Sequence, residues 1–169
     1  METNVIYNED CIEGMKRLPD KSVDLIVTDP PYKFENKGGG FYSKNKSTKR
    51  KYLDSLRKEG CTEFNPINFL NLINQKCKKF YAYIFCNKSL IADYLNYAIQ
   101  NDYKYDLLTM SKKNPMPTTN NSHLPDLEYI VLIREGGTYF SDSANFDDYR
   151  KNYSTSCKKE NIQHKKMSN

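Results

Sequence analysis

The stretch "VDLIVTDPPY", residues 23–32, combines an apolar run with an abrupt stop. The apolar residues from Val23 to Val27 show little polar alternation, which predicts a strand buried on both faces of a sheet. Pro30 and Pro31 cannot continue the hydrogen bonding of a sheet, so we expect the strand to end at Asp29. The sequence therefore predicts that a carboxylate, a rigid diproline and an aromatic ring lie together at a strand's carboxyl end.

Outward from this stretch, strand and helix patterns alternate along the chain. Further strands are expected at residues 4–8, 81–87, 105–111 and 127–135. Helices are expected at residues 11–19, from Pro66 behind an Asn65 cap, and after Ser89 as a possible cap. Such alternation predicts one α/β domain over residues 1–169, with a sheet mostly parallel at its centre. The last two strands are expected to be antiparallel, because the loop between them has no helical pattern.

Composition limits the class of protein. The mean hydropathy is −0.82, and no apolar run approaches the roughly 20 residues that a membrane-spanning helix needs. The start of the chain lacks a secretory pattern, so a cytoplasmic protein is expected. The five cysteines are scattered without a paired motif and the two histidines are isolated, so no metal site is predicted.

Positive charge is concentrated in two segments. Nine basic residues lie between Lys33 and Lys58, within a loop over residues 33–60 that is expected to be flexible, and a second basic segment forms the tail, residues 151–169. Such segments suit a polyanion, but a solvated loop and tail are about as consistent with the composition. The candidate phosphate contacts in the loop are Lys33, Lys37, Lys44 and Lys46.

In open α/β sheets, ligands bind at the carboxyl ends of strands, which is where "DPPY" is expected. This motif, within "NEDCIEGMKRLPDKSVDLIVTDPPY", resembles the amino-methylating DNA methyltransferases of the β-class. The resemblance implies an incomplete Rossmann-like methyltransferase sheet, S-adenosylmethionine as cofactor and double-stranded DNA as partner. It also implies methylation of adenine N6, with cytosine N4 as the other base choice, in a restriction-modification or stand-alone enzyme of a prokaryote or phage.

The residue types suit that chemistry. An exocyclic amino group is a poor nucleophile, and acceptors that draw on its N–H bonds favour a reactive, pyramidal nitrogen. Asp29 supplies a carboxylate, while Pro30 and Pro31 hold a rigid carbonyl without a competing N–H. Tyr32 can stack on a base flipped from the duplex. A strand-ending turn with a core tyrosine is the alternative interpretation of the motif taken alone.

Other residues become candidates through the same resemblance. Asp10 and Cys11 match an Asp-Cys pair near the cofactor's adenine, although a helix-capping Asp10 and a buried Cys11 are the structural alternative. Lys112, Asn114 and Pro115 belong to "MSKKNPMP", which is similar to a segment beside the target base, with Met110 in place of a tryptophan. An ordinary Asn-Pro turn is the alternative for Asn114, and Glu128 is expected to be a structural partner.

The family's glycine-rich cofactor turn has no counterpart after any predicted strand, because "GGG" at residues 38–40 lies in the basic loop. The missing strands should leave an unpaired edge beside residues 23–29, open to a homodimer or a complementing methyltransferase fragment. The alternative function is thus a truncated, catalytically incompetent DNA-binding chain. Methylation of RNA or of a protein amide is a third possibility, and the Asp of "DPPY" together with "NPMP" favours DNA.

Overall fold

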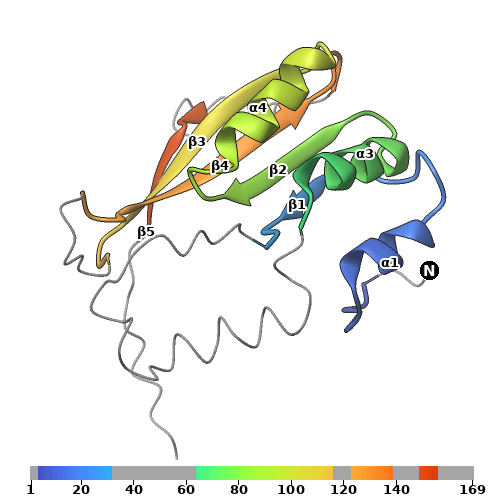
Figure 1. Ribbon diagram of the computed structural model, residues 1–169, viewed down its shortest axis with the longest axis horizontal. Coiled ribbons are helices and arrows are strands. Elements are labelled where there is room, and N and C mark those ends of the chain that lie inside the picture. The colour runs from blue at the N-terminus through green and yellow to red at the C-terminus, as the bar shows by residue number, and fades with distance from the viewer. Residues whose placement is uncertain (1–3, 32–63, 116–122, 139–148, 156–169) are drawn as a thin grey trace, which may run out of the picture.

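The computed structural model describes residues 4–31, 64–115, 123–138 and 149–155 (Figure 1). In chain order, the elements are α1 (Cys11–Lys16), β1 (Ile26–Thr28), α3 (Pro66–Lys76), β2 (Tyr81–Cys86), α4 (Ile91–Gln100), β3 (Lys104–Lys112), β4 (Leu127–Arg134) and β5 (Asn152–Thr155). None of the helices described is long and apolar enough to cross a membrane.

The strands form one open sheet in the order β1-β2-β4-β3-β5. β1 pairs with β2 in parallel, with Thr28 opposite Ile84, and β5 pairs with β3 in parallel. β4 is antiparallel to both of its neighbours, so the pairing of β3 with β4 confirms the prediction for the last two strands. The prediction of a parallel centre is wrong, because β4 inserts between the parallel strands β2 and β3.

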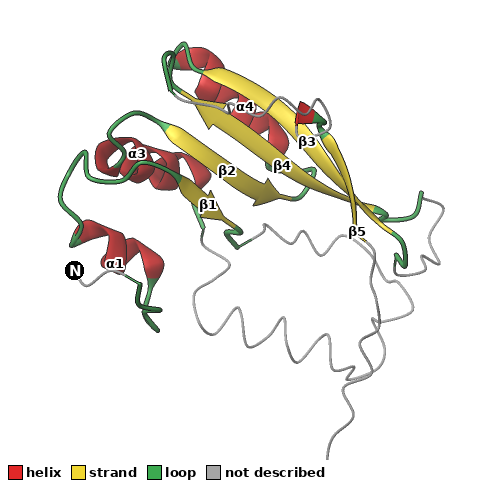
Figure 2. Ribbon diagram, turned by 180° about the vertical axis from the view of Figure 1, so that it is seen from behind, coloured by secondary structure: helices red, strands yellow, loops and turns green. Residues whose placement is uncertain are grey.

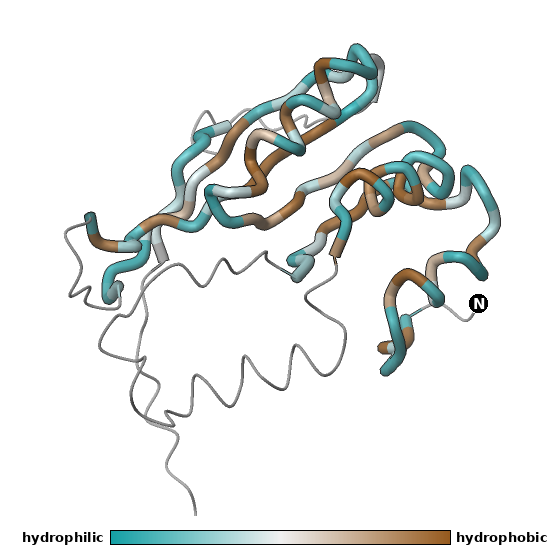
Figure 3. Tube along the Cα trace, viewed as in Figure 1, coloured by the Kyte–Doolittle hydropathy of each residue, from teal (hydrophilic) through white to brown (hydrophobic). Residues whose placement is uncertain are grey.

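Helices α3 and α4 cover one face of the sheet, as Figure 2 shows from the opposite side. Their apolar residues and the inward side chains of β2 and β4 form the main core, whose fully buried members include Leu70, Ile73, Ile84, Tyr94 and Ile133. In Figure 3, brown apolar stretches of α3 and α4 mark the residues from which this core is built. A smaller cluster on the other face is centred on Leu108, Ile130 and Leu132.

The start of α3 confirms the predicted cap. The Oδ1 atom of Asn65 accepts hydrogen bonds from the backbone N–H groups of Ile67 and Asn68 at 3.0 and 3.1 Å, and Pro66 occupies the first helical position. The predicted Ser89 cap of α4 is wrong. The N-cap position of α4 belongs to Leu90, whose side chain makes no capping bond, while the Ser89 hydroxyl donates to Asn87.

Two strand predictions need correction, and one strand was not predicted. β1 is not buried on both faces: Val27 is 64% exposed and Leu25 is 45% exposed, because β1 is an edge strand with β2 as its one neighbour in the described sheet. Residues 4–8 are not a strand, and Ile6 is 98% exposed in them. β5, in the part of the basic tail that the structure describes, was not predicted, and it pairs with β3.

Candidate active site

Asp29 lies where the sequence predicts it, directly after β1 at the carboxyl end of the strand. The residue is exposed, whereas Pro30 is buried and Pro31 is half-buried. Because β1 and β2 are parallel, this end of β1 lies beside the carboxyl end of β2, which closes with Cys86. The carboxylate is thus presented to solvent from a backbone that the diproline anchors.

The Cys86 thiol, at the carboxyl end of β2, has a raised pKa. Burial, and to a smaller extent the negative charge of Asp29, raise the pKa of the Cys86 thiol to about 12. The thiol therefore stays protonated at neutral pH and is a poor nucleophile.

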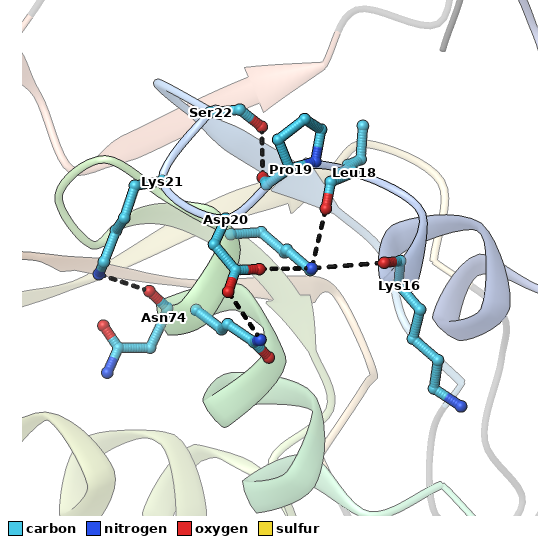
Figure 4. Close-up of polar contacts among 9 residues, drawn as sticks. Lys16, Leu18, Pro19, Asp20, Lys21, Ser22 and Asn74 are labelled. Atoms are coloured by element: carbon cyan, nitrogen blue, oxygen red, sulfur yellow. Dashed lines mark hydrogen bonds and ion pairs between the residues drawn. The ribbon is translucent and has the colours of Figure 1, made fainter.

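A buried lysine connects α1 and the turn before β1 to α3 (Figure 4). The side chain of Lys76 is 6% exposed, and its Nζ donates to Asp20 Oδ1 at 2.6 Å and to the backbone oxygen of Leu18 at 2.8 Å, with Lys16 O at 3.4 Å. Lys21 Nζ also donates to the backbone oxygen of Asn74 at 2.9 Å. These contacts fix the path of the chain from α1 into β1, and hence the position of Asp29.

The Asp20 carboxylate responds to this arrangement. Its pKa is lowered, first by the hydrogen bond from Lys76 and then by that from Gln75, whose Nε2 donates to Oδ2 at 3.0 Å. Asp20 is therefore ionised at neutral pH and pairs with the charged lysine.

Asp10 and Cys11 begin α1. The Oδ1 atom of Asp10 accepts from the N–H groups of Ile12 and Glu13 at 2.9 and 3.0 Å, so the capping alternative holds for this residue. The alternative of a buried Cys11 is wrong, because its side chain is exposed. Cys11 can still face a ligand, whereas one oxygen of Asp10 is committed to the helix.

The described residues fit only part of S-adenosylmethionine. The resemblance assigns Asp10 and Cys11 to its adenine, but no described strand is followed by a glycine-rich turn that would cradle the methionine end. Gly136 and Gly137 follow β4. Because β4 is antiparallel to β2, they lie at the other end of the strands from Asp29.

Asn114 and Pro115 follow β3. Because β3 is parallel to β2, its carboxyl end lies at the same end of the sheet as Asp29. In the sheet order, β1 and β3 are three strand spacings apart, roughly 14 Å. Lys112 forms an ion pair with Glu128, which fits the structural role expected for Glu128. Asp29, Lys112 and Asn114 thus lie at the same end of the sheet, but Asn114 does not lie against Asp29.

Several candidates lie outside the described residues, namely Tyr32, Lys33, Lys37, Lys44, Lys46 and the glycines at 38–40. A cavity of about 650 Å³ lies at the other end of the sheet, beside Lys21, Asn74, Tyr103 and Glu135. Since Asp29 is at the carboxyl end of β1, this cavity is separate from the candidate active site.

Comparisons with known proteins support the sheet and the start of the chain. No family model matches. A 35-residue segment is 49% identical to part of the type II methyltransferase M.HinfI of Haemophilus influenzae. The matched segment makes up 21% of this chain and 10% of that protein. The crystal structure of the M1.HpyAVI–SAM complex has a TM-score of 0.58 at 18% identity, over 89% of this chain and 63% of that one. The cytosine-N4-specific PvuII DNA methyltransferase has a TM-score of 0.53 at 14% identity, over 93% and 58%.

The chain has a DNA methyltransferase fold. The predicted resemblance to the amino-methylating DNA methyltransferases and the predicted Rossmann-like class are thereby confirmed. The chain spans about 60% of these two solved methyltransferases, and the predicted unpaired edge is present at β1 in the described sheet. Within this methyltransferase fold, β1 carries Asp29.

Sequence reasoning missed two buried residues with polar groups, Lys76 and Tyr94. Lys76 follows Ile73 by three positions, so it stands on the apolar stripe of α3, and a lysine at such a position was the available signal. Tyr94 is buried in the first turns of α4, and its helical spacing from Leu90 and Tyr97 indicated burial but not a role.

Proposed function

We propose that the chain is the base-activating part of a site-specific DNA adenine-N6 methyltransferase that uses S-adenosylmethionine. The observation that carries this proposal is the position of Asp29, Pro30 and Pro31 at the carboxyl end of β1, beside the end of the parallel strand β2. Ligands of open α/β sheets bind at such ends. The 35-residue match to a type II methyltransferase and the likeness to a SAM complex support the reaction class.

The residues of this chain would act on the amino nitrogen. The Asp29 carboxylate accepts one N–H bond and the carbonyl of Pro30 accepts the other, which makes the lone pair available for attack. Tyr32 would stack on the flipped adenine and hold its amino group in that position. When bound, S-adenosylmethionine supplies an electrophilic methyl group on a sulfonium.

The choice of adenine rests on two sequence features, Asp29 in the first position of "DPPY" and the segment "NPMP". One of the structural neighbours is a cytosine-N4-specific enzyme, so the fold is compatible with either amino group. Asn114 and Lys112, at the same edge as Asp29, would contact the base edge or the adjacent phosphates.

Double-stranded DNA is the proposed partner. Lys33, Lys37, Lys44 and Lys46 would contact phosphates, so the affinity should fall steeply as salt rises. A protein of this kind belongs in the cytoplasm of a prokaryote or in a phage-infected cell, either as part of a restriction-modification system or alone.

The unpaired edge of β1 favours a second candidate, a methyltransferase chain that is incompetent alone and needs a complementing partner. Val27 and Leu25 are exposed there, and a parallel strand added at this edge would cover both. The added strands could come from a second copy or from a complementing methyltransferase fragment. Titration calorimetry with S-adenosylmethionine separates the candidates: the first predicts binding by the chain alone, and absence of binding at millimolar cofactor favours the second.

Transfer of tritiated methyl groups to duplex DNA tests the role of Asp29. Asp29→Ala should abolish transfer while leaving DNA affinity within about twofold, because the carboxylate acts on the amino group and not on phosphates. Asp24→Ala is the matched control, since Asp24 lies before the start of β1 and pairs with exposed Lys78 at 2.7 Å. Full activity of the Asp29 variant would refute the proposed role.

A further inference from the structure

Lys76 is the one charged residue that is buried within the described part of the chain. It follows Ile73 on the apolar stripe of α3, where a leucine or a methionine would pack without the cost of desolvating an ammonium group. Its Nζ donates to three oxygens of one short segment, namely Asp20 Oδ1 and the backbone oxygens of Lys16 and Leu18. The buried charge therefore binds the segment that leads from α1 into β1.

The backbone of Lys76 binds the same segment at a second place. Its carbonyl oxygen accepts hydrogen bonds from the N–H groups of Ser22 and Val23 at 2.9 and 3.0 Å. The N–H of Lys78 donates to the backbone oxygen of Val23 at 2.8 Å, which completes an isolated parallel bridge between Val23 and Cys77. The ammonium and the carbonyl of one residue together tie residues 16–23 to the end of α3.

This bridge and the pairing of β1 are not one continuous ladder. Val23 lies opposite Cys77, but Ile26 lies opposite Ala82, so two residues on one side face four on the other. β1 itself forms three residue pairs with β2, at the edge of the described sheet. Such a short ladder specifies its register weakly, because a slip by two residues keeps every side chain on its own face. That slip would move Asp29 by roughly 7 Å along the sheet.

We propose that Lys76 is a positioning residue for Asp29: its ammonium holds residues 16–23 against α3 and thereby fixes the register in which β1 pairs with β2. This inference rests on the proposed function, because it gives Asp29 a bound base to act on. In the fixed register, Asp29 directly follows the last residue of β1, at the carboxyl ends of two parallel strands. A misplacement of about 1 Å can lower a rate about a hundredfold, so a slipped register would disable the carboxylate.

Nuclear Overhauser contacts between β1 and β2 test the register without any turnover. In the wild type they should join Val27 to Tyr83, which lie opposite each other. Lys76→Met keeps the apolar stem and removes the charge. In this variant the contacts of Val27 with Tyr83 should be lost or replaced by contacts two residues along β2, whereas Tyr83 keeps its contacts with Leu132 of β4.

Lys78→Met is the matched control, because it removes an ammonium from an exposed ion pair, and it should change neither set of contacts. Retained contacts between Val27 and Tyr83 in Lys76→Met would overturn the proposal. Loss of the contacts of Tyr83 with Leu132 as well would assign Lys76 to the overall stability of the fold, and would also overturn it.

A disulfide can take the place of the ammonium. Val23 and Cys77 lie opposite each other, both pack in the main core, and paired strands lie about 5 Å apart, which suits a disulfide. When Val23→Cys is added to Lys76→Met, oxidation should restore the contacts between Val27 and Tyr83, and reduction should remove them. If they stay absent in protein whose disulfide is confirmed by mass, the inference is wrong.

Methyl transfer to duplex DNA gives the functional readout, at a temperature at which circular dichroism shows each variant to be folded. In Lys76→Met, kcat should fall about a hundredfold while KM for DNA stays within about twofold, because the change displaces the reacting carboxylate and not the phosphate contacts. Oxidation of the disulfide variant should restore kcat. A slipped register with unchanged kcat would overturn the positioning role. Methyl transfer with an unchanged register would leave the proposed function standing without this inference, and a slipped register in a chain whose wild type transfers no methyl group would refute the proposed function instead.

Discussion

Replacing Lys76 with methionine should destabilise the fold by about 2 kcal/mol. The change keeps the apolar stem of a side chain that is 6% exposed and removes the Nζ that bonds Asp20 and the Leu18 carbonyl at 2.6 and 2.8 Å. Hydrogen bonds from a charged group contribute about 1.5–3 kcal/mol each. Part of this loss is offset because the ammonium no longer has to be desolvated. For the roughly 100 residues that the structure describes, the net loss corresponds to roughly 10 °C in the unfolding midpoint.

The matched control is Lys78→Met. Lys78 also pairs with an aspartate, Asp24, at 2.7 Å, but their side chains are 56% and 77% exposed. Exposed pairs contribute about 0–1 kcal/mol, so this variant should lose less than 1 kcal/mol. Urea unfolding followed by circular dichroism measures both variants. The reasoning fails if Lys76→Met loses no more stability than Lys78→Met.

Three further variants test local features by the same unfolding assay. Asn65→Ala should cost about 1 kcal/mol, because it removes the cap of α3; no loss would contradict the cap. Gly14→Ala should stabilise by about 0.5–1 kcal/mol, since the nearest atom to its new Cβ is Glu9 Oε1 at 3.1 Å, at the end of a side chain that also pairs with Arg17, and a loss would mean that this pair holds Glu9 in place. Asp20 has a lowered pKa in the folded state, so its contribution is present above the unfolded value near 3.8 and is lost as pH falls through the folded value. Asp20→Asn should therefore weaken the loss of stability at acid pH, and an unchanged pH profile would count against the pairing with Lys76.

Local chemistry made much of the fold predictable. Asn65 and Pro66 specify a helix start through capping and a fixed φ angle, and the structure follows them. The diproline stops β1 next to Asp29 because proline has no N–H for the sheet. The pairing of β3 with β4 followed from a connecting loop without a helical pattern.

The errors have a common origin in pairing at long range. The apolar run of β1 predicts burial on both faces, but Val27 is exposed because burial depends on neighbours that the described sheet does not supply. β5 was missed because its pairing with β3 comes from a distant strand and not from its own short polar sequence. Lys76 was missed because its acceptors, including Asp20, are more than 50 residues away in the chain.

The measurement that tests the central claim most directly is mass spectrometry of nucleosides from duplex DNA incubated with the chain and S-adenosylmethionine. We expect N6-methyldeoxyadenosine with the wild type and none with Asp29→Ala, because we propose that Asp29, at the carboxyl end of β1, activates the amino group. The same yield from both proteins, or no methylated nucleoside from the wild type, would contradict the claim.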